Sequence, residues 1–459
     1  MQLVLGPWGD GRPCYTTAGR ARQEGPGTPQ LRHIEDFETA IESSMGGGGL
    51  SAFRTLRRLA LKNSWRVYLV GGPVRDVLLN AAIKDLDFGV EGDAPALAQQ
   101  LAEELGGRVV THPRFMTAAL VMPELRIDLV TARREVYPRP GDLPRVFPGS
   151  VTDDLSRRDF SINALALPLW ENAPQVLDPE GGLADLDAGV VRALHERSFR
   201  DDPTRLLRAA RYEQRLGFEL EGQTRHWLAD SVAKGFLRRV SGDRIRHELE
   251  RTFEEKQPLP ALRRAAGLGV LAAIHPAWEK DMLTVGAFSD AFRESFRDGA
   301  TDYDSLMYLA GLVYHCSPAQ GETLTRRLNM PKAWAEVVRD TVHVRGIESR
   351  LAKEGLPSSH IYRLLQSLSP VALRAVAKIT SSQRVSEALN LFLDKLSGVA
   401  PGLRGGDLIS LGVPAGPMVS QILERLRDCR LDDQVNTAED ERRWVLEYLR
   451  SVDNPKQGD

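Results

Sequence analysis

Two aspartates spaced by two residues, Asp85 and Asp87, are the side chains whose types and spacing point most directly to chemistry. On a strand, residues i and i+2 point to the same face of the sheet. Two carboxylates on one face repel each other unless a cation lies between them, and oxygen ligands are those that Mg²⁺ prefers. The same spacing also occurs at solvated strand edges, so the pair alone leaves both interpretations open.

A pair of glycines precedes these aspartates. The apolar run 67–70 predicts a short buried strand, which ends at Gly71-Gly72, where a backbone without side chains can turn sharply. Pro73 then favours the start of a helix. A strand, a glycine turn and a helix start together present backbone N–H groups to a phosphate. A simple turn is the alternative, but a phosphate site beside paired carboxylates favours metal-dependent nucleotidyl transfer.

A third carboxylate lies on a further predicted strand. The run 126–130 presents Asp128, which could orient or deprotonate an attacking hydroxyl, or be an ordinary strand-end aspartate. The next segment, 131–154, is rich in proline and predicts a long loop.

Adjacent arginines follow that loop. Arg157 and Arg158 can grip phosphate oxygens, while Asp159 and Asn163 can hold a ribose hydroxyl. A solvated basic turn that enters a helix is the alternative interpretation.

Composition limits the class of protein. At 459 residues the chain is too long for one core, so two to four domains are expected. No apolar run approaches the roughly 18 residues of a membrane span, and the start lacks the pattern of a secretory signal. Cys14, Cys316 and Cys429 are far apart, which excludes a disulfide framework and favours the reducing cytoplasm. The net charge of −2 hides a concentration of arginine between 192 and 251 that could bind phosphates.

The remaining pattern is mostly helical. Residues 1–33 predict a disordered extension, and a helical pattern from Ile34 is interrupted at 46–49. A helix is expected over 94–105, closed by Gly106-Gly107, with strands at 109–110 and 118–122. Amphipathic patterns predict further helices at 306–313, 334–344, 371–379 and 444–449.

Three motifs in this order carry a family resemblance: Leu-Val-Gly-Gly-Pro-Val-Arg-Asp at 69–76, Asp-Leu-Asp at 85–87, and Arg-Arg-Asp-Phe-Ser-Ile-Asn-Ala at 157–164. The set resembles the head of class II tRNA nucleotidyltransferases, the CCA-adding enzymes and bacterial poly(A) polymerases of the DNA polymerase β-like superfamily. Residues 178–186 resemble the family's linker motif and 200–211 its nucleotide-selecting motif. Residues 241–249 resemble the helix that braces that motif, so the likeness covers roughly 65–275.

The resemblance implies an α+β fold. A small head with a mixed five-stranded sheet would occupy residues 34–190, followed by an all-helical neck (191–275) and a helical body and tail (276–459) that bind tRNA.

The resemblance also assigns roles to individual residues. Asp85 and Asp87 would bind catalytic Mg²⁺, with Asp128 as third carboxylate. Nucleotide contacts would come from Gly71, Gly72, Arg75, Arg158, Asp159, Asn163, Asp202, Arg205, Arg208 and Arg211.

The base-reading part of this assignment has partial physical support. Arg205, Arg208 and Arg211 are three residues apart, so they share one face of a helix. The resemblance makes Asp202 and Arg205 the pair that reads the base. Asp202 directly precedes Pro203, however, so it also fits a helix N-cap.

The implied reaction is attack of a tRNA 3′-hydroxyl on the α-phosphate of CTP or ATP, with release of pyrophosphate. In the family the loop that corresponds to 133–154 helps the pocket switch from C to A, and here it lacks the stretch associated with full CCA addition. Addition of CC, of A, or of both therefore stays open, as does the oligomeric state. A poly(A) polymerase and a non-catalytic RNA-binding module are the alternatives.

Overall fold

The computed structural model describes residues 33–171, 174–279 and 302–453. Nearly all of the predicted N-terminal extension lies outside these ranges. The chain divides into two compact units, one of residues up to 134 with 146–190, the other of 135–145 with the residues from 191 onward. Each unit is described by itself.

The first unit, or head, is built on a mixed sheet of six strands in the order β3-β4-β5-β2-β1-β8. Strands β2 and β5 are parallel, and the other described pairings are antiparallel. The family resemblance implied five strands, and the short edge strand β8 brings the sheet to six. The bounds are Arg66–Val70 (β1), Leu86–Glu91 (β2), Arg108–His112 (β3), Thr117–Val121 (β4), Arg126–Thr131 (β5) and Ala166–Pro168 (β8).

The helices of the head begin and end near the predicted signals. Helix α1 (Ile34–Asn63) bends at Gly46, whose φ of 67° lies in the left-handed region, where the sequence predicted an interruption. Helix α3 (Ala94–Leu105) is capped by the Asp93 side chain and ends at Gly106. The others are α2 (Gly72–Leu78), α4 (Val151–Ser156) and α5 (Gly182–Ala188).

The predicted loop 131–154 is wrong in one respect, because it contains a two-stranded ribbon of β6 (Arg133–Val136) and β7 (Arg145–Pro148). Three prolines lie between these strands and Pro148 ends β7. Each strand of a two-stranded ribbon is an edge strand, and edges and strand ends tolerate proline. High proline content is therefore compatible with the ribbon.

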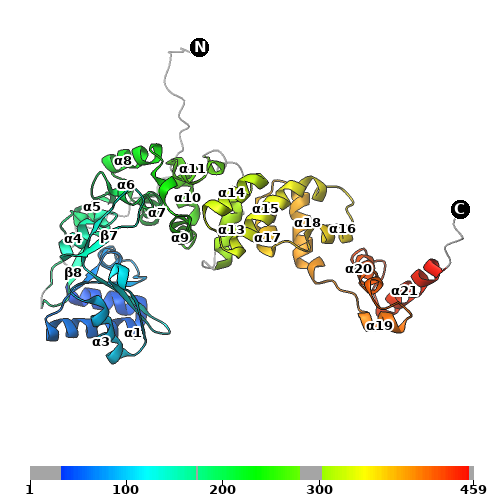
Figure 1. Cartoon of the computed structure of the whole chain (residues 1–459), viewed down its shortest axis with the longest axis horizontal. Helices are drawn as coiled ribbons and strands as arrows, with labels where there is room; N and C mark the ends of the chain where they lie inside the picture. Colours follow the sequence, from blue (N-terminus) through cyan, green and yellow to red (C-terminus); the bar gives the residue numbers. More distant parts are fainter. Residues whose placement is uncertain (1–32, 172–173, 280–301, 454–459) are drawn as a thin grey trace, which may run out of the picture. The chain divides into compact units, whose positions relative to one another are not determined.

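The second unit is largely helical, in agreement with the prediction, but not wholly so, because β9 (Val190–Val191) pairs with β10 (Glu219–Leu220). Figure 1 shows the strands concentrated in the blue to cyan part of the chain, and helices α13 to α18 packed side by side. The helix bounds are Ser198–Asp201 (α6), Arg205–Leu216 (α7), Gly222–Ala233 (α8), Gly242–Phe253 (α9), Pro258–Gly267 (α10), Val270–Ile274 (α11), Asp302–Val313 (α13), Pro318–Arg327 (α14), Lys332–Leu351 (α15), Ser358–Leu365 (α16), Pro370–Ile379 (α17), Gln383–Asp394 (α18), Gly405–Ser410 (α19), Pro417–Leu431 (α20) and Ala438–Asp453 (α21).

Aromatic and apolar side chains form the cores of the second unit. Phe253 of α9 stacks near Tyr308 and Trp334, which joins α9 to α13 and α15. At the C-terminal end, an apolar cluster from α19, α20 and α21 is closed by the buried Glu441, which accepts hydrogen bonds from the amides of Gly402 and Leu403.

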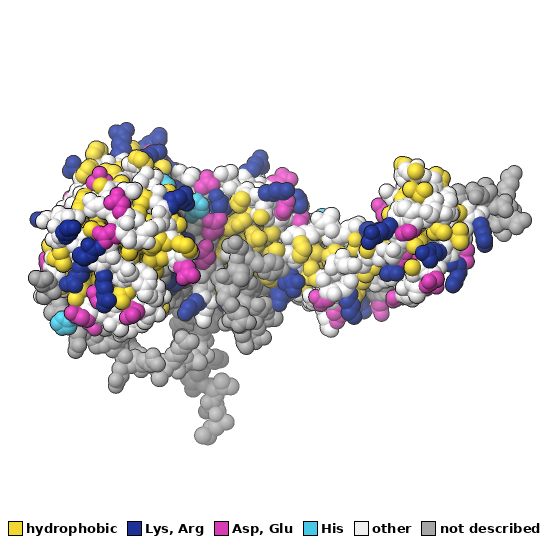
Figure 2. Space-filling model, turned by 90° about the horizontal axis from the view of Figure 1, so that it is seen from below, with side chains coloured by type: hydrophobic (Ala, Val, Ile, Leu, Met, Phe, Trp, Pro, Cys, Tyr) yellow, Lys and Arg dark blue, Asp and Glu magenta, His cyan; other side chains and the backbone are white. Residues whose placement is uncertain are grey.

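The surface is mixed in charge. On the face seen in Figure 2, basic and acidic side chains alternate with apolar ones and form no extended patch of one sign among the residues coloured there. None of the helices described here is both long enough and apolar enough to span a membrane.

Candidate active site

The three predicted catalytic aspartates lie at neighbouring positions of β2 and β5. Asp87 and Asp128 are directly opposed in the parallel register of these strands, and Asp85 immediately precedes β2. Their neighbours Leu86 and Ile127 are fully buried, while Asp87 and Asp128 are half-buried, so the carboxylates share the solvent-facing side of the sheet.

Asp128 is held by a neighbour on its own strand. The guanidinium of Arg126 donates to both carboxylate oxygens of Asp128, at 2.8–3.2 Å. Hydrogen bonds and charge from Asp128 raise the pKa of Arg126, and the charges of Asp85 and Asp87 add to the effect. The three carboxylates therefore act on Arg126 together, as neighbouring negative charges do.

The aspartates are of the right ligand type for a hard divalent cation such as Mg²⁺, because such cations prefer oxygen ligands. Across the described ranges, no three His, Cys, Asp or Glu side chains lie close enough together to hold a metal ion. The aspartates would thus complete a site together with other oxygen ligands, such as phosphate or water.

The glycine turn has a steric cause. Gly71 ends β1 with φ 76°, and its N–H donates to the carbonyl of Leu165 at 2.9 Å. A Cβ on Gly71 would lie 2.3 Å from Nη1 of Arg158, whereas one on Gly72 would meet nothing closer than 3.6 Å. The φ of 76° is what requires glycine at position 71, and the same absence of a side chain leaves room for the Arg158 guanidinium beside the backbone.

Arg75 is buried and hydrogen-bonded inside the head, whereas its predicted role as a nucleotide contact requires an accessible side chain. It is 2% exposed, and its guanidinium donates to Asp76 at 2.9 Å and to Oδ1 of Asn163. Asn163 in turn donates to Asp159 at 2.9 Å. Asp159 and Asn163 are also buried, so these residues form an internal polar network beneath the turn. Their roles as nucleotide ligands stay predictions.

Arg158 is the more accessible cation of this region. Its side chain is 20% exposed, and it donates to Asp154 at 3.1 Å and to the Asn163 carbonyl at 3.3 Å. Asp154 also pairs with Arg157. Burial by itself raises the pKa of Asp154, but the charges and hydrogen bonds of Arg157 and Arg158 outweigh it and hold that pKa below its ordinary value. A buried anion thus orients both arginines.

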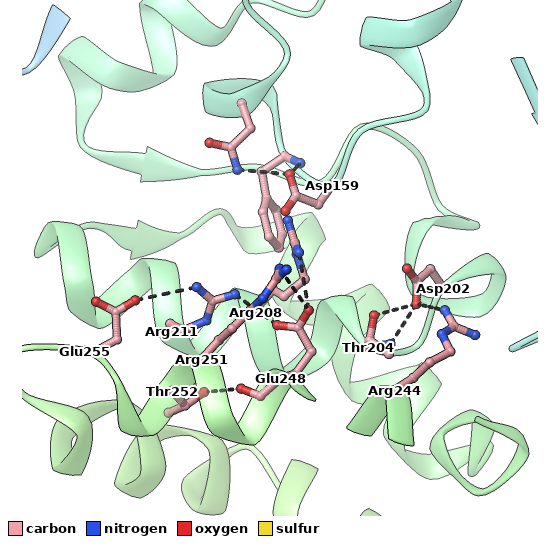
Figure 3. Close-up of polar contacts among 12 residues, drawn as sticks. Asp159, Asp202, Thr204, Arg208, Arg211, Arg244, Glu248, Arg251, Thr252 and Glu255 are labelled. Atoms are coloured by element: carbon pink, nitrogen blue, oxygen red, sulfur yellow. Dashed lines mark hydrogen bonds and ion pairs between the residues drawn. The ribbon is translucent and has the colours of Figure 1, made fainter. Parts of the chain in front are cut away.

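In the second unit, Asp202 lies between α6 and α7. Its Oδ1 accepts three hydrogen bonds, from the amide of Thr204 at 3.0 Å, the Thr204 hydroxyl at 2.6 Å and Nη2 of Arg244 at 2.8 Å (Figure 3). Helix α7 is assigned from Arg205, but Thr204 already has helical backbone angles and its side chain makes no capping bond. Asp202 has extended backbone angles, and its carboxylate accepts from the amide two residues on, which is the geometry of an N-cap. The predicted N-cap role of Asp202 is therefore confirmed.

Arg205, Arg208 and Arg211 all lie on α7, as predicted. Figure 3 shows Arg208 and Arg211 pointing to Glu248 of α9, at 3.3 and 2.9 Å. Arg211 also approaches Glu255 at 3.5 Å and is 6% exposed, whereas the side chain of Arg208 is 24% exposed. Arg208 is therefore the better placed of the two for contact with a ligand, and Arg211 joins α7 to α9.

Sequence reasoning did not single out Asp154, Arg244 or Glu248 as site residues. The spacing of Asp154 to Arg157 and Arg158, three and four residues, is a helical pairing signal that was available. Arg244 and Glu248 lie in the motif 241–249, but their partners, Asp202 before α7 and Arg211 on α7, are distant in sequence.

Comparison with known proteins agrees with this geometry. Residues 67–192 match the model of the "Poly A polymerase head domain", and residues 217–282 match the "Probable RNA and SrmB- binding site of polymerase A". The A-adding tRNA nucleotidyltransferase of Geobacter sulfurreducens is 37% identical over 84% of this chain, which spans 45% of that protein's length.

Two relatives match over most of both chains. The A-adding tRNA nucleotidyltransferase of Halalkalibacterium halodurans is 31% identical over 93% of this chain and 97% of its own. The CC-adding tRNA nucleotidyltransferase of Deinococcus radiodurans is 31% identical over 84% of this chain and 90% of its own. Among solved structures, the CCA-adding enzyme of Thermotoga maritima complexed with tRNA superposes with a TM-score of 0.71, at 29% identity over 92% of this chain and all of that one.

The mixed-sheet head, the aspartates on β2 and β5 and these matches define a nucleotidyltransferase of the poly(A) polymerase head type. Within that class, the chain belongs to the family of tRNA nucleotidyltransferases that includes the A-adding, CC-adding and CCA-adding enzymes.

Proposed function

We propose that the protein adds the terminal A to a tRNA that ends in CC, with ATP as the nucleotide. The observation that carries this proposal is the match to an A-adding relative over 97% of that relative's length, beside the 37% identity to a second A-adding enzyme. The CC-adding relative, at 31% identity over 90% of its length, makes CC addition the second candidate.

In the proposed reaction the tRNA 3′-hydroxyl oxygen attacks the α-phosphorus of ATP. A new P–O bond forms there, the bond between the α-phosphorus and its bridging oxygen breaks, and pyrophosphate leaves. Asp128 would accept the hydroxyl proton after exchanging its pair with Arg126, a role that its position opposite Asp87 supports. Arg158, the partly exposed cation beside Gly71, would hold phosphate oxygens.

Asp85 and Asp87 would hold Mg²⁺, whose chemistry when bound is to stabilise charge on the attacking and leaving oxygens. The support is the donor set itself, carboxylate oxygens on the adjacent strands β2 and β5. With tRNA as the substrate, we also propose that the protein acts in the cytoplasm, in accord with its few, widely separated cysteines.

The base edge of adenine presents an amino donor and a ring-nitrogen acceptor. Asp202 would accept from the amino group and Arg205 would donate to the ring nitrogen, as the resemblance implies. Guanine and uracil present the opposite pattern and would leave a buried polar group unpaired, which is costly. Cytosine presents the same amino donor and ring acceptor as adenine, so the positions of the Asp202 and Arg205 atoms, and not the pattern alone, would separate A from C. The ribbon contacts Arg244 at Gly141, which links it to the residue that also holds Asp202.

The test is incorporation by the purified full chain with Mg²⁺ and three tRNA transcripts, one without CCA, one ending in C and one ending in CC. Each receives ATP alone, CTP alone, and both. A single A added only to the CC-ended transcript is the expected result. CC added to the bare transcript would instead identify a CC-adding enzyme, and full CCA would identify one enzyme for both steps.

Two outcomes would overturn the tRNA assignment. Long A tails on unrelated RNA would identify a poly(A) polymerase. Retention of tRNA without incorporation of either nucleotide, at any divalent ion concentration, would identify a binding module.

A further inference from the structure

Arg244, in the first turn of α9, joins two segments that are far apart in the sequence. Its Nη2 donates to Oδ1 of Asp202 at 2.8 Å, and its Nη1 donates to the carbonyl of Gly141, at the ribbon tip, at 2.7 Å. Gly141 has φ 79°, and a Cβ there would lie 3.3 Å from Cβ of Arg239 and 3.4 Å from Val240. The ribbon tip therefore packs against the chain that leads into α9.

The contact fixes which oxygen of Asp202 stays available. Oδ1 is saturated by Arg244 and by both donors of Thr204, whereas Oδ2 has no hydrogen-bond partner within the described ranges. A carboxylate held by three donors on one oxygen cannot rotate freely, so Oδ2 keeps a fixed direction. That oxygen is the one left to accept a hydrogen bond from a base.

The same turn of α9 is fixed to the end of α14. A Cβ on Gly242 would lie only 2.4 Å from the carbonyl oxygen of Arg327 and 2.7 Å from the carbonyl carbon of Leu328. Asn329, just beyond α14, donates through Nδ2 to both oxygens of Asp243, at 3.0 and 3.2 Å. Arg244 thus follows directly after two residues that are clamped to α14.

We propose that Asn329 and Arg244 are positioning residues for nucleotide selection, and that the contact of α14 with α9 sets the direction of the Asp202 carboxylate. The inference rests on the proposed base-reading role of Asp202. If the end of α14 moves, the first turn of α9 moves with it and carries Arg244 along. Because Arg244 is bonded to both Asp202 and Gly141, the Asp202 carboxylate and the ribbon tip then change position together. Nucleotide choice is then coupled to the helices that follow the neck, through one guanidinium.

The experiment compares kcat/KM for ATP and for CTP on a CC-ended transcript, with full-length protein, for Arg244→Ala, Arg244→Lys and Asn329→Ala. We expect Arg244→Ala to change the ATP to CTP ratio by at least about tenfold, since a misdirected acceptor no longer rejects the wrong base. Asn329→Ala should move the ratio the same way by about two- to fivefold, as the loss of an exposed hydrogen bond predicts. Arg244→Lys should lie between, because an ammonium can satisfy Asp202 or Gly141 but lacks the fork to hold both.

The control variants are Arg225→Ala, an exposed arginine that also donates to a backbone carbonyl, and Asn390→Ala, an exposed amide on α18. Both should leave the ratio unchanged. Equilibrium binding of ATP and CTP, which needs no turnover, is measured for all variants.

The nucleotide that the wild-type protein prefers tests the proposed function. The change of the ATP to CTP ratio in the variants tests the positioning role of Arg244 and Asn329, whichever nucleotide the wild type prefers. A ratio that stays constant in Asn329→Ala and in folded Arg244 variants would overturn the inference, as would equal loss for both nucleotides. If Arg244→Ala does not fold, Arg244→Lys and Asn329→Ala decide the question, since Asn329 is exposed.

Discussion

Asp87 and Asp128 are direct register partners on the parallel strands β2 and β5. Adjacent strands lie about 4.8 Å apart, so these carboxylates are held at a separation that a shared cation or a shared substrate can bridge. The alternation of buried and half-buried residues fixes both on the same face, and a slip of one residue in either strand would separate them.

Replacing Asp87 by asparagine should reduce incorporation by at least about a thousandfold while tRNA affinity changes little, because the lost group belongs to the metal and triphosphate chemistry. Single-turnover incorporation and a filter-binding assay measure the two quantities. The exposed Asp187, on α5, supplies the control Asp187→Asn. Normal turnover in Asp87→Asn would remove this residue from the catalytic set.

In the glycine turn, substitution of Gly71 should destabilise the protein more than substitution of Gly72. Gly71→Ala places a methyl group where Nη1 of Arg158 lies and imposes a left-handed φ on alanine, so we expect about 1–3 kcal/mol of destabilisation and a raised KM for the nucleotide. Gly72→Ala has space and ordinary φ, and serves as the matched control for stability; its KM is no control, because Gly72 is itself a predicted nucleotide contact. Thermal unfolding compares the two variants, and steady-state kinetics measures the KM of Gly71→Ala against the wild type. Equal stability of both variants would contradict the assigned backbone cause.

Replacing the buried Arg75 by alanine should lower the stability of the protein rather than its affinity for the nucleotide. Arg75→Ala removes the ion pair with the buried Asp76 and the hydrogen bond to Asn163, which should cost about 3–5 kcal/mol. Hydrogen exchange of peptides from β1 and α2 in mild urea would localise this loss to the head. A variant that keeps its stability but has a greatly raised KM would support the predicted triphosphate contact instead.

The Asp154 pair with Arg157 and Arg158 predicts a pH dependence of stability. Since the folded pKa of Asp154 lies below the unfolded value, near 3.9, its contribution is complete above about pH 4 and is lost as the pH falls through the folded pKa. Asp154→Asn should lower the free energy of unfolding at pH 7 by about 1–3 kcal/mol and flatten the decline below pH 4. Unfolding curves from pH 2 to 7 measure both effects. A variant with the parent's acid decline would show that other carboxylates cause it.

The sequence predicted the parts of the site that depend on local pattern. The strand before Gly71 and the placing of Asp85 and Asp87 on one face follow from the apolar run, the turn residues and the two-residue spacing. The helix that carries Arg205 was implied by the family resemblance, with the three-residue spacing of the arginines as support. The ribbon at 133–148 was not predicted, because proline content hides strands that have no interior neighbour. The roles of Arg75 and Arg211 depend on Asn163 and Glu248, partners distant in the chain that no local pattern identifies.

The ribbon tip is held through the Gly141 carbonyl, which every residue type possesses. That contact constrains the length of the ribbon and the conformation of its apex, and leaves most of its side chains free to vary. We therefore expect substitutions along this hairpin to disturb the Gly141 contact less than the gain or loss of a residue does. If the proposed link from the ribbon to Asp202 holds, insertions and deletions there would change nucleotide choice more than substitutions would.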